Sequence, residues 1–362
     1  MVLESKSSLL GVNNCTKQLY DKSQVKIPPG ISNGCIACDL RGLFIESTFE
    51  CTVTTAPVVP SNLLFSVWNH ANYMAGYEQQ DAHEFLIALL DGLSVHLEKY
   101  HGEVSTHKVN NSSKEGLASS TNTSRESLNE YTGESSPFHG FVNDTFAGTL
   151  QSELLCHTCG HRSCRSEPFL DISLSLPTTA TASRNGSILL TDCLTQYTSM
   201  ETLSELIKCD ACNTHQPYYK QLSISELPQV LIIHLKRFDA IKETKLSTHV
   251  TFPLTDLNLA LYSKPGNSSA TSTARSKKNS LNSDSVGGDK SASLYELHGV
   301  VTHRGTLNQG HYVSYVCIKE VEEGDGNVSK KWLKCDDEWI TVVDSSEVEM
   351  CEAYLLFYTR IK

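Results

Sequence analysis

The chain has 362 residues, 39% of them apolar, and its 41 acidic and 30 basic side chains give a net charge of −11. This length suits one large domain or two ordinary ones, and the apolar content can fill a core, which excludes a globally disordered chain. The acidic balance disfavours direct nucleic-acid binding, and the longest aliphatic run, residues 230–233, is far shorter than the ~20 residues of a membrane helix.

Residues 1–34 form an atypical N-terminal segment, which we separate from the main predicted domain at 35–362. The segment has no charged start followed by an apolar stretch, so no secretory signal is expected. The expected compartment is therefore the nucleus or the cytosol. Thirteen cysteines in a reducing compartment point to metal binding or catalysis before disulfides.

Residues 61–100 are predicted to form a helical block. Apolar side chains recur at helical spacing first around Leu63 and Val67, and then from Ala82 to residue 97. Residues 60–62, Pro-Ser-Asn, are expected to cap the first helix, and Gly76 is expected to separate the two helices.

Two polar segments, residues 102–135 and 262–293, interrupt the apolar pattern. Each contains 12 Ser or Thr residues and few large apolar side chains. Because neither segment can bury enough surface to offset the entropy of ordering it, both are predicted to be disordered insertions.

Strand patterns dominate residues 138–252 and the C-terminal part of the chain. Residues 170–176 alternate with a period of two, and residues 230–235 are typical of a strand buried on both faces. Further strands are expected at 295–315, 331–343 and 353–359. A sheet assembled from both sides of the second insertion favours one composite α+β domain over two independent domains.

Two Cys-x-x-Cys pairs lie in the predicted strand region. They are Cys156 with Cys159 and Cys209 with Cys212. Four thiolates presented by two tight turns are the ligand set of a structural zinc ion, with bonds of about 2.3 Å. The sequence therefore predicts a Cys₄ zinc site at these positions.

A candidate catalytic pair lies near the C-terminus. His311 follows Gly310 at the start of an aromatic-rich strand, and Asp336 and Asp337 come at the end of a later strand. If the two strands are neighbours, a carboxylate holds one imidazole nitrogen and leaves the other as a base. Gly310, which has no Cβ, is expected to let a substrate backbone approach closely.

In this combination the sequence resembles the ubiquitin-specific proteases, the papain-like family that removes ubiquitin from proteins. Five motifs follow the order of the family: GYEQQDAHEF at 76–85, the two cysteine pairs, LPQVLIIHLKRF at 227–238, GHY at 310–312 and WLKCDD at 332–337. The first motif and the pair Cys35 and Cys38 are most similar to the nuclear subgroup in the deubiquitinating module of the SAGA transcription coactivator.

This resemblance implies an α+β fold with a thumb, a palm and zinc-ribbon fingers that carry the four cysteines. It implies that His311 is the general base and that Asp336 orients it, with Asp337 beside it. It also implies a set of ubiquitin-binding residues, namely Gln79, Gln80, Asp81, Gly310 and Tyr312. The first three are expected in a thumb helix, where Asp81 pairs with arginines of the ubiquitin tail. The implied partners are ubiquitin, a ubiquitinated protein such as a histone, and coactivator subunits.

The nucleophile motif of the family is missing. Cys15 is the only cysteine before Cys35, but Leu10 takes the place of the asparagine that donates to the oxyanion, and the residues after Cys15 are too polar for a buried helix. We therefore expect an incomplete thumb helix. Three interpretations stay open: Cys15 is the nucleophile, a preceding segment is absent from this chain, or the chain is a catalytically dead ubiquitin-binding module.

Cys35 and Cys38 present a parallel case. In the subgroup this pair completes a second zinc site with an upstream histidine and cysteine, and here no histidine precedes His70. We expect that site to be half built. The leading hypothesis is a thiol-dependent deubiquitinase. The alternatives are a ubiquitin-binding scaffold without turnover and a zinc-ribbon interaction protein that does not bind ubiquitin.

Overall fold

The computed structural model describes residues 34–47, 57–76, 79–109, 140–177, 187–239, 244–263, 293–306, 309–321 and 328–361. The chain divides into two compact units, Met1–Asn143 and Asp144–Lys362, which are described separately. Cys15, residues 110–135 and residues 264–292 lie outside the described part, so the predictions made for them are not tested. None of the described helices is long and apolar enough to cross a membrane.

The first unit is helical. Its elements are α2 (Ile36–Ile45), α3 (Ser61–His70), the 3₁₀ turn η2 (Asn72–Met74) and α4 (Ala82–Val109). Helix α2 packs against both α3 and α4. Ile36 is fully buried, and its backbone N–H donates to Nδ1 of His96 at 3.0 Å. Helix α2 was not predicted, whereas the apolar face predicted for α3 is confirmed by the burial of Leu63 and Val67.

The two helices predicted around Gly76 are confirmed, but three details differ. The N-cap of α3 lies at Pro60, within the predicted segment 60–62, but no side chain donates or accepts a capping hydrogen bond there. Residues 79–81 precede α4 and are not inside a helix. Helix α4 continues to Val109, so residues 102–109 are helical although they were assigned to a disordered insertion.

The second unit is mostly β. Its strands are β1 (Gly148–Cys156), β2 (Arg162–Phe169), β3 (Asp171–Ser175), β4 (Ile188–Leu189), β5 (Glu201–Thr202), β6 (Ile207–Lys208), β7 (His215–Gln216), β8 (Tyr218–Glu226), β9 (Val230–Lys236), β10 (Phe238–Asp239), β11 (Thr244–Lys245), β12 (Val250–Thr251), β13 (Leu257–Asn258), β14 (Leu294–Gly305), β15 (Gly310–Val321), β16 (Val328–Asp336), β17 (Trp339–Val343) and β18 (Ala353–Arg360). Its helical segments are α6 (Leu190–Tyr197), η3 (Ala260–Tyr262) and α7 (Ser345–Glu349). Helix α5 (Phe141–Phe146) spans the division between the two units.

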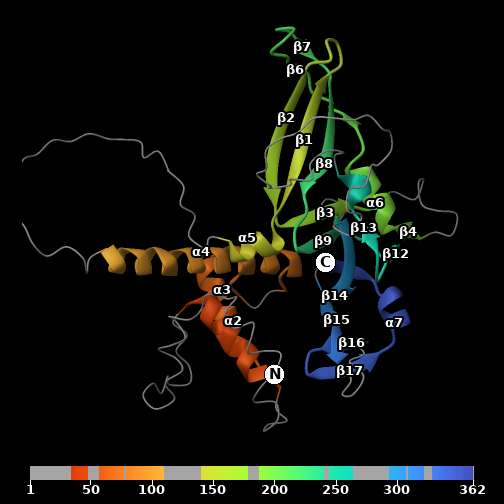
Figure 1. The fold of residues 1–362 in the computed structure, drawn as a ribbon. Coiled ribbons are helices and arrows are strands. Elements are labelled where there is room, and N and C mark those ends of the chain that lie inside the picture. The colour runs from red at the N-terminus through yellow and green to blue at the C-terminus, as the bar shows by residue number, and fades with distance from the viewer. Residues whose placement is uncertain are drawn as a thin grey trace, which may run out of the picture. The chain divides into compact units, whose positions relative to one another are not determined.

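The central sheet has the strand order β17-β16-β15-β14-β18-β9-β3, and β13 adds to β14 (Figure 1). Among the described strands of this sheet, β3 and β9 form the parallel pair and the other pairs are antiparallel. Strands from both sides of residues 264–292 share this sheet, as predicted. The prediction of a strand buried on both faces is confirmed by β9, where Leu231, Ile232 and Ile233 are all fully buried.

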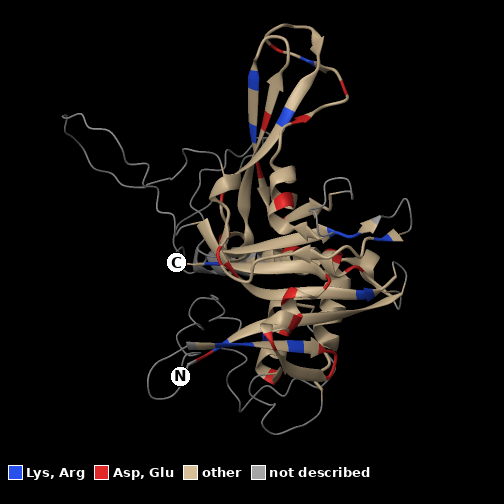
Figure 2. Ribbon diagram, turned by 90° about the vertical axis from the view of Figure 1, so that its right-hand side faces the viewer, with Lys and Arg blue, Asp and Glu red and all other residues tan. Residues whose placement is uncertain are grey.

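A second sheet, ordered β2-β1-β8-β5, projects away from the central sheet, and the β6–β7 hairpin lies at its far end (Figure 1). Lys and Arg residues alternate with Asp and Glu residues along this projection, so it presents no field of a single sign (Figure 2). We call these strands, with the β6–β7 hairpin, the finger sheet.

Helices α6 and α7 were not anticipated. The signal for α6 was present, because its three buried side chains recur at helical spacing: Leu190, Cys193 and Leu194. Helix α6 is only eight residues long. Because strand patterns surround it, its helical spacing was not recognised in the sequence.

Candidate functional site

His311 and Asp336 are brought together by three consecutive antiparallel strands of the central sheet. His311 is the second residue of β15 and lies opposite Arg304 of β14. Asp336 is the last residue of β16, which pairs with β15. Strand pairing therefore closes a gap of 25 residues, as the sequence predicted.

The imidazole of His311 contacts both predicted carboxylates. Its Nε2 lies 2.7 Å from Oδ1 of Asp336 and 3.9 Å from Oδ2 of Asp337. The hydrogen bond from His311 lowers the pKa of Asp336 below its ordinary value, so this carboxylate stays ionised at neutral pH. With Nε2 held in this way, Nδ1 is the nitrogen that can accept a proton.

The packing around Gly310 has no room for a side chain at this position. A Cβ at this position would lie 2.0 Å from Nε2 of His303 and 2.5 Å from the carbonyl oxygen of Arg304. This clash accounts for the glycine without any substrate, and the expectation that Gly310 lets a substrate backbone approach stays a prediction. The missing side chain makes room for the buried ring of His303, which supports the strand that presents His311.

An aromatic cluster surrounds Tyr312, the residue that follows His311 in β15. The ring of Tyr312 is 4.7 Å from that of His303 and 6.2 Å from that of Tyr354, measured between centroids. Tyr354 comes from β18, 42 residues further along the chain. Sequence reasoning named Tyr312 but missed Tyr354 and His303, because only the sheet order places these three strands together.

The four predicted metal ligands converge at the end of the finger sheet. Cys156 ends β1, and the other three cysteines lie in the turns that follow β1 and β6. Each turn has the same backbone bonds: the amide of Gly160 bonds to the carbonyl of Cys156, and that of Asn213 to the carbonyl of Cys209. Gly160 and Asn213 both adopt the left-handed conformation that such turns require.

These four thiols fit a tetrahedral metal ion. Cys156 Sγ is 4.0 Å from Cys212 Sγ, and Cys159 Sγ is 3.7 Å from Cys209 Sγ. All four sulfurs lie within 4.8 Å of one another. Metal–sulfur bonds of about 2.3 Å place tetrahedral ligands about 3.8 Å apart, so the spacing suits such an ion. The cluster can therefore hold a metal, as predicted from the two pairs.

Asp81, predicted to bind ubiquitin, has a structural role at the start of α4. Its Oδ1 accepts a hydrogen bond from the backbone N–H of His83 at 2.6 Å, and its carbonyl accepts from Phe85. These bonds make Asp81 the N-cap of the helix. Gln79 and Gln80 immediately precede it. The motif therefore starts the helix, whereas the prediction placed it inside.

Cys35 and Cys38 meet at the N-terminus of α2. The hydrogen bond from the Cys38 thiol lowers the pKa of Cys35 to about 5. Among the described residues, the groups of three or more ligand atoms that could hold a metal include neither cysteine. The incomplete second zinc site thus stays a prediction.

A Ser, His and Asp set on β3 and β9 has the wrong order for catalysis. Ser173 Oγ lies 2.8 Å from His234 Nδ1 and 3.0 Å from Asp171 Oδ2. The serine is therefore between the other two groups, whereas a nucleophilic triad needs the histidine in the middle. We interpret these residues as a polar link between two parallel strands.

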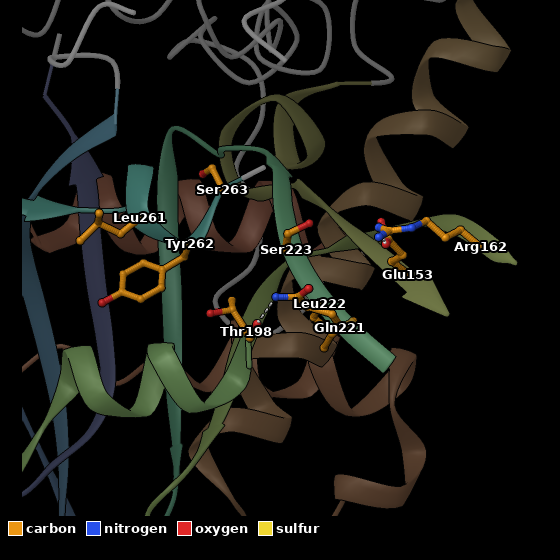
Figure 3. A pocket seen from close by; sticks show the side chains of 9 residues that line it. All are labelled: Glu153, Arg162, Thr198, Gln221, Leu222, Ser223, Leu261, Tyr262 and Ser263. Carbon is orange, nitrogen blue, oxygen red and sulfur yellow. Dashed lines mark hydrogen bonds and ion pairs between the residues drawn. The ribbon is translucent and has the colours of Figure 1, made fainter. Parts of the chain in front are cut away.

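A cavity of about 350 Å³ lies beside strands β1 and β8 of the finger sheet (Figure 3). Gln221 crosses part of it to donate a hydrogen bond to the carbonyl of Thr198. The side chains that line it are those of Glu153, Arg162, Thr198, Gln221, Leu222, Ser223, Leu261, Tyr262 and Ser263. The cavity contains none of the predicted catalytic or metal-binding residues.

A family model described as "Ubiquitin carboxyl-terminal hydrolase" matches residues 6–358. Similar proteins include ubiquitin carboxyl-terminal hydrolase 22-A of Xenopus laevis, 35% identical over 91% of this chain, and hydrolase 22 of Homo sapiens, 34% identical over 91%. Hydrolase 27 of Homo sapiens is 33% identical over 90% of this chain. The chain covers 58% of each hydrolase 22 and 68% of hydrolase 27.

Solved structures agree with this result. The chain is similar to the SAGA Ubp8/Sgf11/Sus1/Sgf73 DUB module bound to ubiquitin aldehyde, with 26% identity and a TM-score of 0.62. That match covers 99% of this chain and 64% of the solved chain. A structure of the module bound to monoubiquitin matches with 26% identity, a TM-score of 0.60, and 91% and 59% coverage.

Proposed function

Because the chain belongs to the ubiquitin carboxyl-terminal hydrolase family, we propose that it is a thiol-dependent deubiquitinase. The reaction is hydrolysis of the peptide or isopeptide bond after the C-terminal glycine of ubiquitin. The hydrogen bond of 2.7 Å between His311 and Asp336 is the observation that carries this proposal. It pre-positions a base in the way that thiol proteases require.

The proposed roles follow from this geometry. Asp336 fixes the ring through Nε2, and Nδ1 of His311 takes the proton of a cysteine thiol. The thiolate attacks the carbonyl carbon, the leaving amine is protonated, and water then releases ubiquitin from the acyl-enzyme. Asp337, at 3.9 Å, adds a second negative charge that favours the imidazolium formed during the reaction.

Cys15 is the proposed nucleophile. The family match begins at residue 6 and so includes this cysteine, although the segment lies outside the described residues. In the described part, no cysteine is hydrogen-bonded to His311. The second candidate function is a ubiquitin-binding module without turnover. Leu10 supports this alternative, because in the family an asparagine that donates to the oxyanion occupies the same place.

Zinc is the proposed ion of the finger sheet, held by Cys156, Cys159, Cys209 and Cys212. The spacing of the four sulfurs supports this choice. Such an ion closes two turns on one centre and supplies folding free energy, with no part in the chemical step.

The proposed ubiquitin contacts are those expected from the sequence: Gln79, Gln80, Asp81, Gly310 and Tyr312. A nuclear location, binding to coactivator subunits and action on histone-linked ubiquitin are likewise proposed. The support for these three is the similarity to hydrolase 22 and to the SAGA module.

The test uses ubiquitin carrying an electrophilic C-terminus together with a fluorogenic ubiquitin amide. We expect the probe to label one cysteine and Cys15→Ser to abolish labelling. Asp336→Asn is expected to lower kcat by on the order of 100-fold, because the histidine loses its orienting charge, while ubiquitin affinity is retained. Asp337→Asn is the matched control, with a loss of less than about 10-fold, since its carboxylate lies farther away.

The outcomes separate the candidate functions. Ubiquitin binding without labelling or hydrolysis would contradict the enzyme and favour the binding module. Absence of both ubiquitin binding and hydrolysis would contradict the enzyme and the ubiquitin-binding module. The remaining candidate would then be the zinc-ribbon interaction protein. Labelling of a cysteine other than Cys15 would keep the enzyme and reject only that nucleophile.

A further inference from the structure

The end strand of the central sheet, β17, has an unusual surface. Natural sheets protect their edge strands with charges, proline or a covering segment, because the free backbone groups can pair with another chain. In β17 the side chains of Trp339, Ile340 and Val342 are 69%, 62% and 69% exposed. Only Val343, at the end of the strand, packs against the core.

Among the described strands, the pairing register shows which backbone groups of β17 are not used by β16. A two-residue turn joins β16 to β17, and Asp336 lies opposite Trp339. In such a hairpin the closing pair exchanges hydrogen bonds, and the next pair does not. The backbone N–H and C=O groups of Ile340 and Val342 therefore point away from β16. They form a short hydrogen-bonding edge at the end of the sheet.

This edge begins at the candidate catalytic pair. Residues directly opposite each other in an antiparallel pair project on the same face of the sheet. Trp339 therefore shares a face with Asp336, whose carboxylate binds His311. A chain that paired with β17 would start next to the bond that the enzyme cleaves.

The negative charge around the edge of β17 indicates the kind of segment that would bind there. Residues 336–350 contain six carboxylates and no Lys or Arg. Asp336 and Asp337 contact His311, and Glu347 is paired with Lys334. In the described part of the chain, Glu338, Asp344 and Glu349 form no ion pair, so exposed negative charge remains at both ends of β17. A complementary partner has alternating apolar and basic side chains.

We propose that β17 binds an extended, apolar and basic segment of the ubiquitin-bearing protein by strand addition. This inference rests on the proposed function, since it assigns the edge to the protein that carries the scissile isopeptide bond. Backbone pairing with Ile340 and Val342 supplies affinity, and the apolar side chains with their acidic flanks supply selectivity.

The first experiment measures binding without turnover. The probe is a fluorescent peptide, acetyl-Lys-Val-Lys-Val-Lys-Val-Lys-amide, and its anisotropy is recorded at physiological salt. We expect it to bind at least about 10-fold more tightly than either of two control peptides. The control with Glu in place of each Lys loses charge complementarity, and the control with Pro in place of each Val loses backbone donors. Equal binding of all three peptides would overturn the proposal.

Matched variants locate the site. Ile340→Lys combined with Val342→Lys is expected to weaken peptide binding about 10-fold, because like charge and lost apolar contact both oppose docking. Both side chains are exposed, so the thermal midpoint should stay unchanged. Met350→Lys is the control, since Met350 is 72% exposed but lies outside the strand, and it should change affinity less than about twofold.

Hydrogen exchange tests whether the edge is free. The amides of Ile340 and Val342 should exchange rapidly in the chain alone and become protected when the peptide is added. Protection before the peptide is added would show that a segment of this chain already covers β17. Protection that rises with protein concentration would show pairing between two copies. Either result would overturn the proposal.

The second experiment identifies the source of the segment. Ubiquitin is joined through its C-terminus to the central lysine of the same peptide by a non-hydrolysable bond. This conjugate should bind at least about 10-fold more tightly than free ubiquitin, because the second contact becomes intramolecular. The gain should disappear in the Ile340→Lys and Val342→Lys variant. A conjugate no tighter than ubiquitin would overturn the assignment to the ubiquitin-bearing protein. Peptide binding without ubiquitin binding would contradict the proposed deubiquitinase function, but it would support β17 as a peptide-binding edge.

Discussion

At the scale of single residues, Asp81 combines a capping role that the structure shows with a proposed role in ubiquitin binding. The family resemblance assigns it to ubiquitin binding, and the structure makes it the N-cap of α4. Either role alone would account for an aspartate at this position. The two roles depend on different properties, because capping needs an oxygen acceptor and pairing with arginine needs a charge.

Asp81→Asn separates these roles. Asparagine caps a helix about as well as aspartate, so we expect the free energy of unfolding to change by less than about 0.5 kcal/mol. Ubiquitin affinity, measured by titration calorimetry, is expected to fall about 5-fold with the loss of one charge-assisted contact. Asp81→Ala is the companion variant and should also cost about 1 kcal/mol of stability. Unchanged ubiquitin affinity in Asp81→Asn would restrict Asp81 to capping.

At the scale of secondary-structure elements, the finger sheet depends on its two cysteine turns. Strands β6 and β7 have two residues each, and a hairpin this short is not stable on its own. The cluster around the metal site is small, with Cys156, Cys209 and Tyr218 as its buried members. A bound ion would therefore replace the core that this end of the sheet lacks.

Cys159→Ser tests this dependence. We expect the variant to lose stoichiometric zinc, measured by elemental analysis, and the thermal midpoint to fall by at least about 4 °C, which corresponds to more than 1 kcal/mol for a unit of this size. Cys164→Ser is the matched control, because Cys164 is an exposed cysteine of β2 outside the cluster. If both variants kept their zinc, the Cys₄ assignment would be wrong.

At the scale of the whole molecule, Arg237 joins distant parts of the second unit. It is fully buried, and its guanidinium donates to the carbonyls of Ala353 at 2.6 Å and of Leu246 and Thr248 at 2.8 Å. Burial lowers the pKa of Arg237. A rigid fork with several donors is the group that can satisfy three converging carbonyls.

Replacing Arg237 should therefore destabilise the fold. Arg237→Met keeps much of the volume but leaves three carbonyls without these donors, one of them buried, and we expect a loss of about 3 kcal/mol in urea denaturation. Arg162→Met, which removes an exposed partner of Glu153, should cost less than about 1 kcal/mol. Similar costs for the two variants would show that the buried network contributes little.

The sequence by itself determined the elements that have a strong period and the sites that have a fixed spacing. Helices α3 and α4, strand β9 and the four-cysteine cluster were all predictable, because each depends on residues close together in the chain or on one coordination geometry. The pairing of His311 with Asp336 was also predictable, once a motif order had indicated that their strands were neighbours.

Tertiary structure alone decided what each position contacts. Gly310 is fixed by the ring of His303, and Tyr354 meets Tyr312 only through the sheet order. Among the described strands, β16 is the one that pairs with β17, which leaves the outer edge of β17 open. Pairings between distant strands are set by the packing of the whole sheet, and no local pattern of residues encodes them.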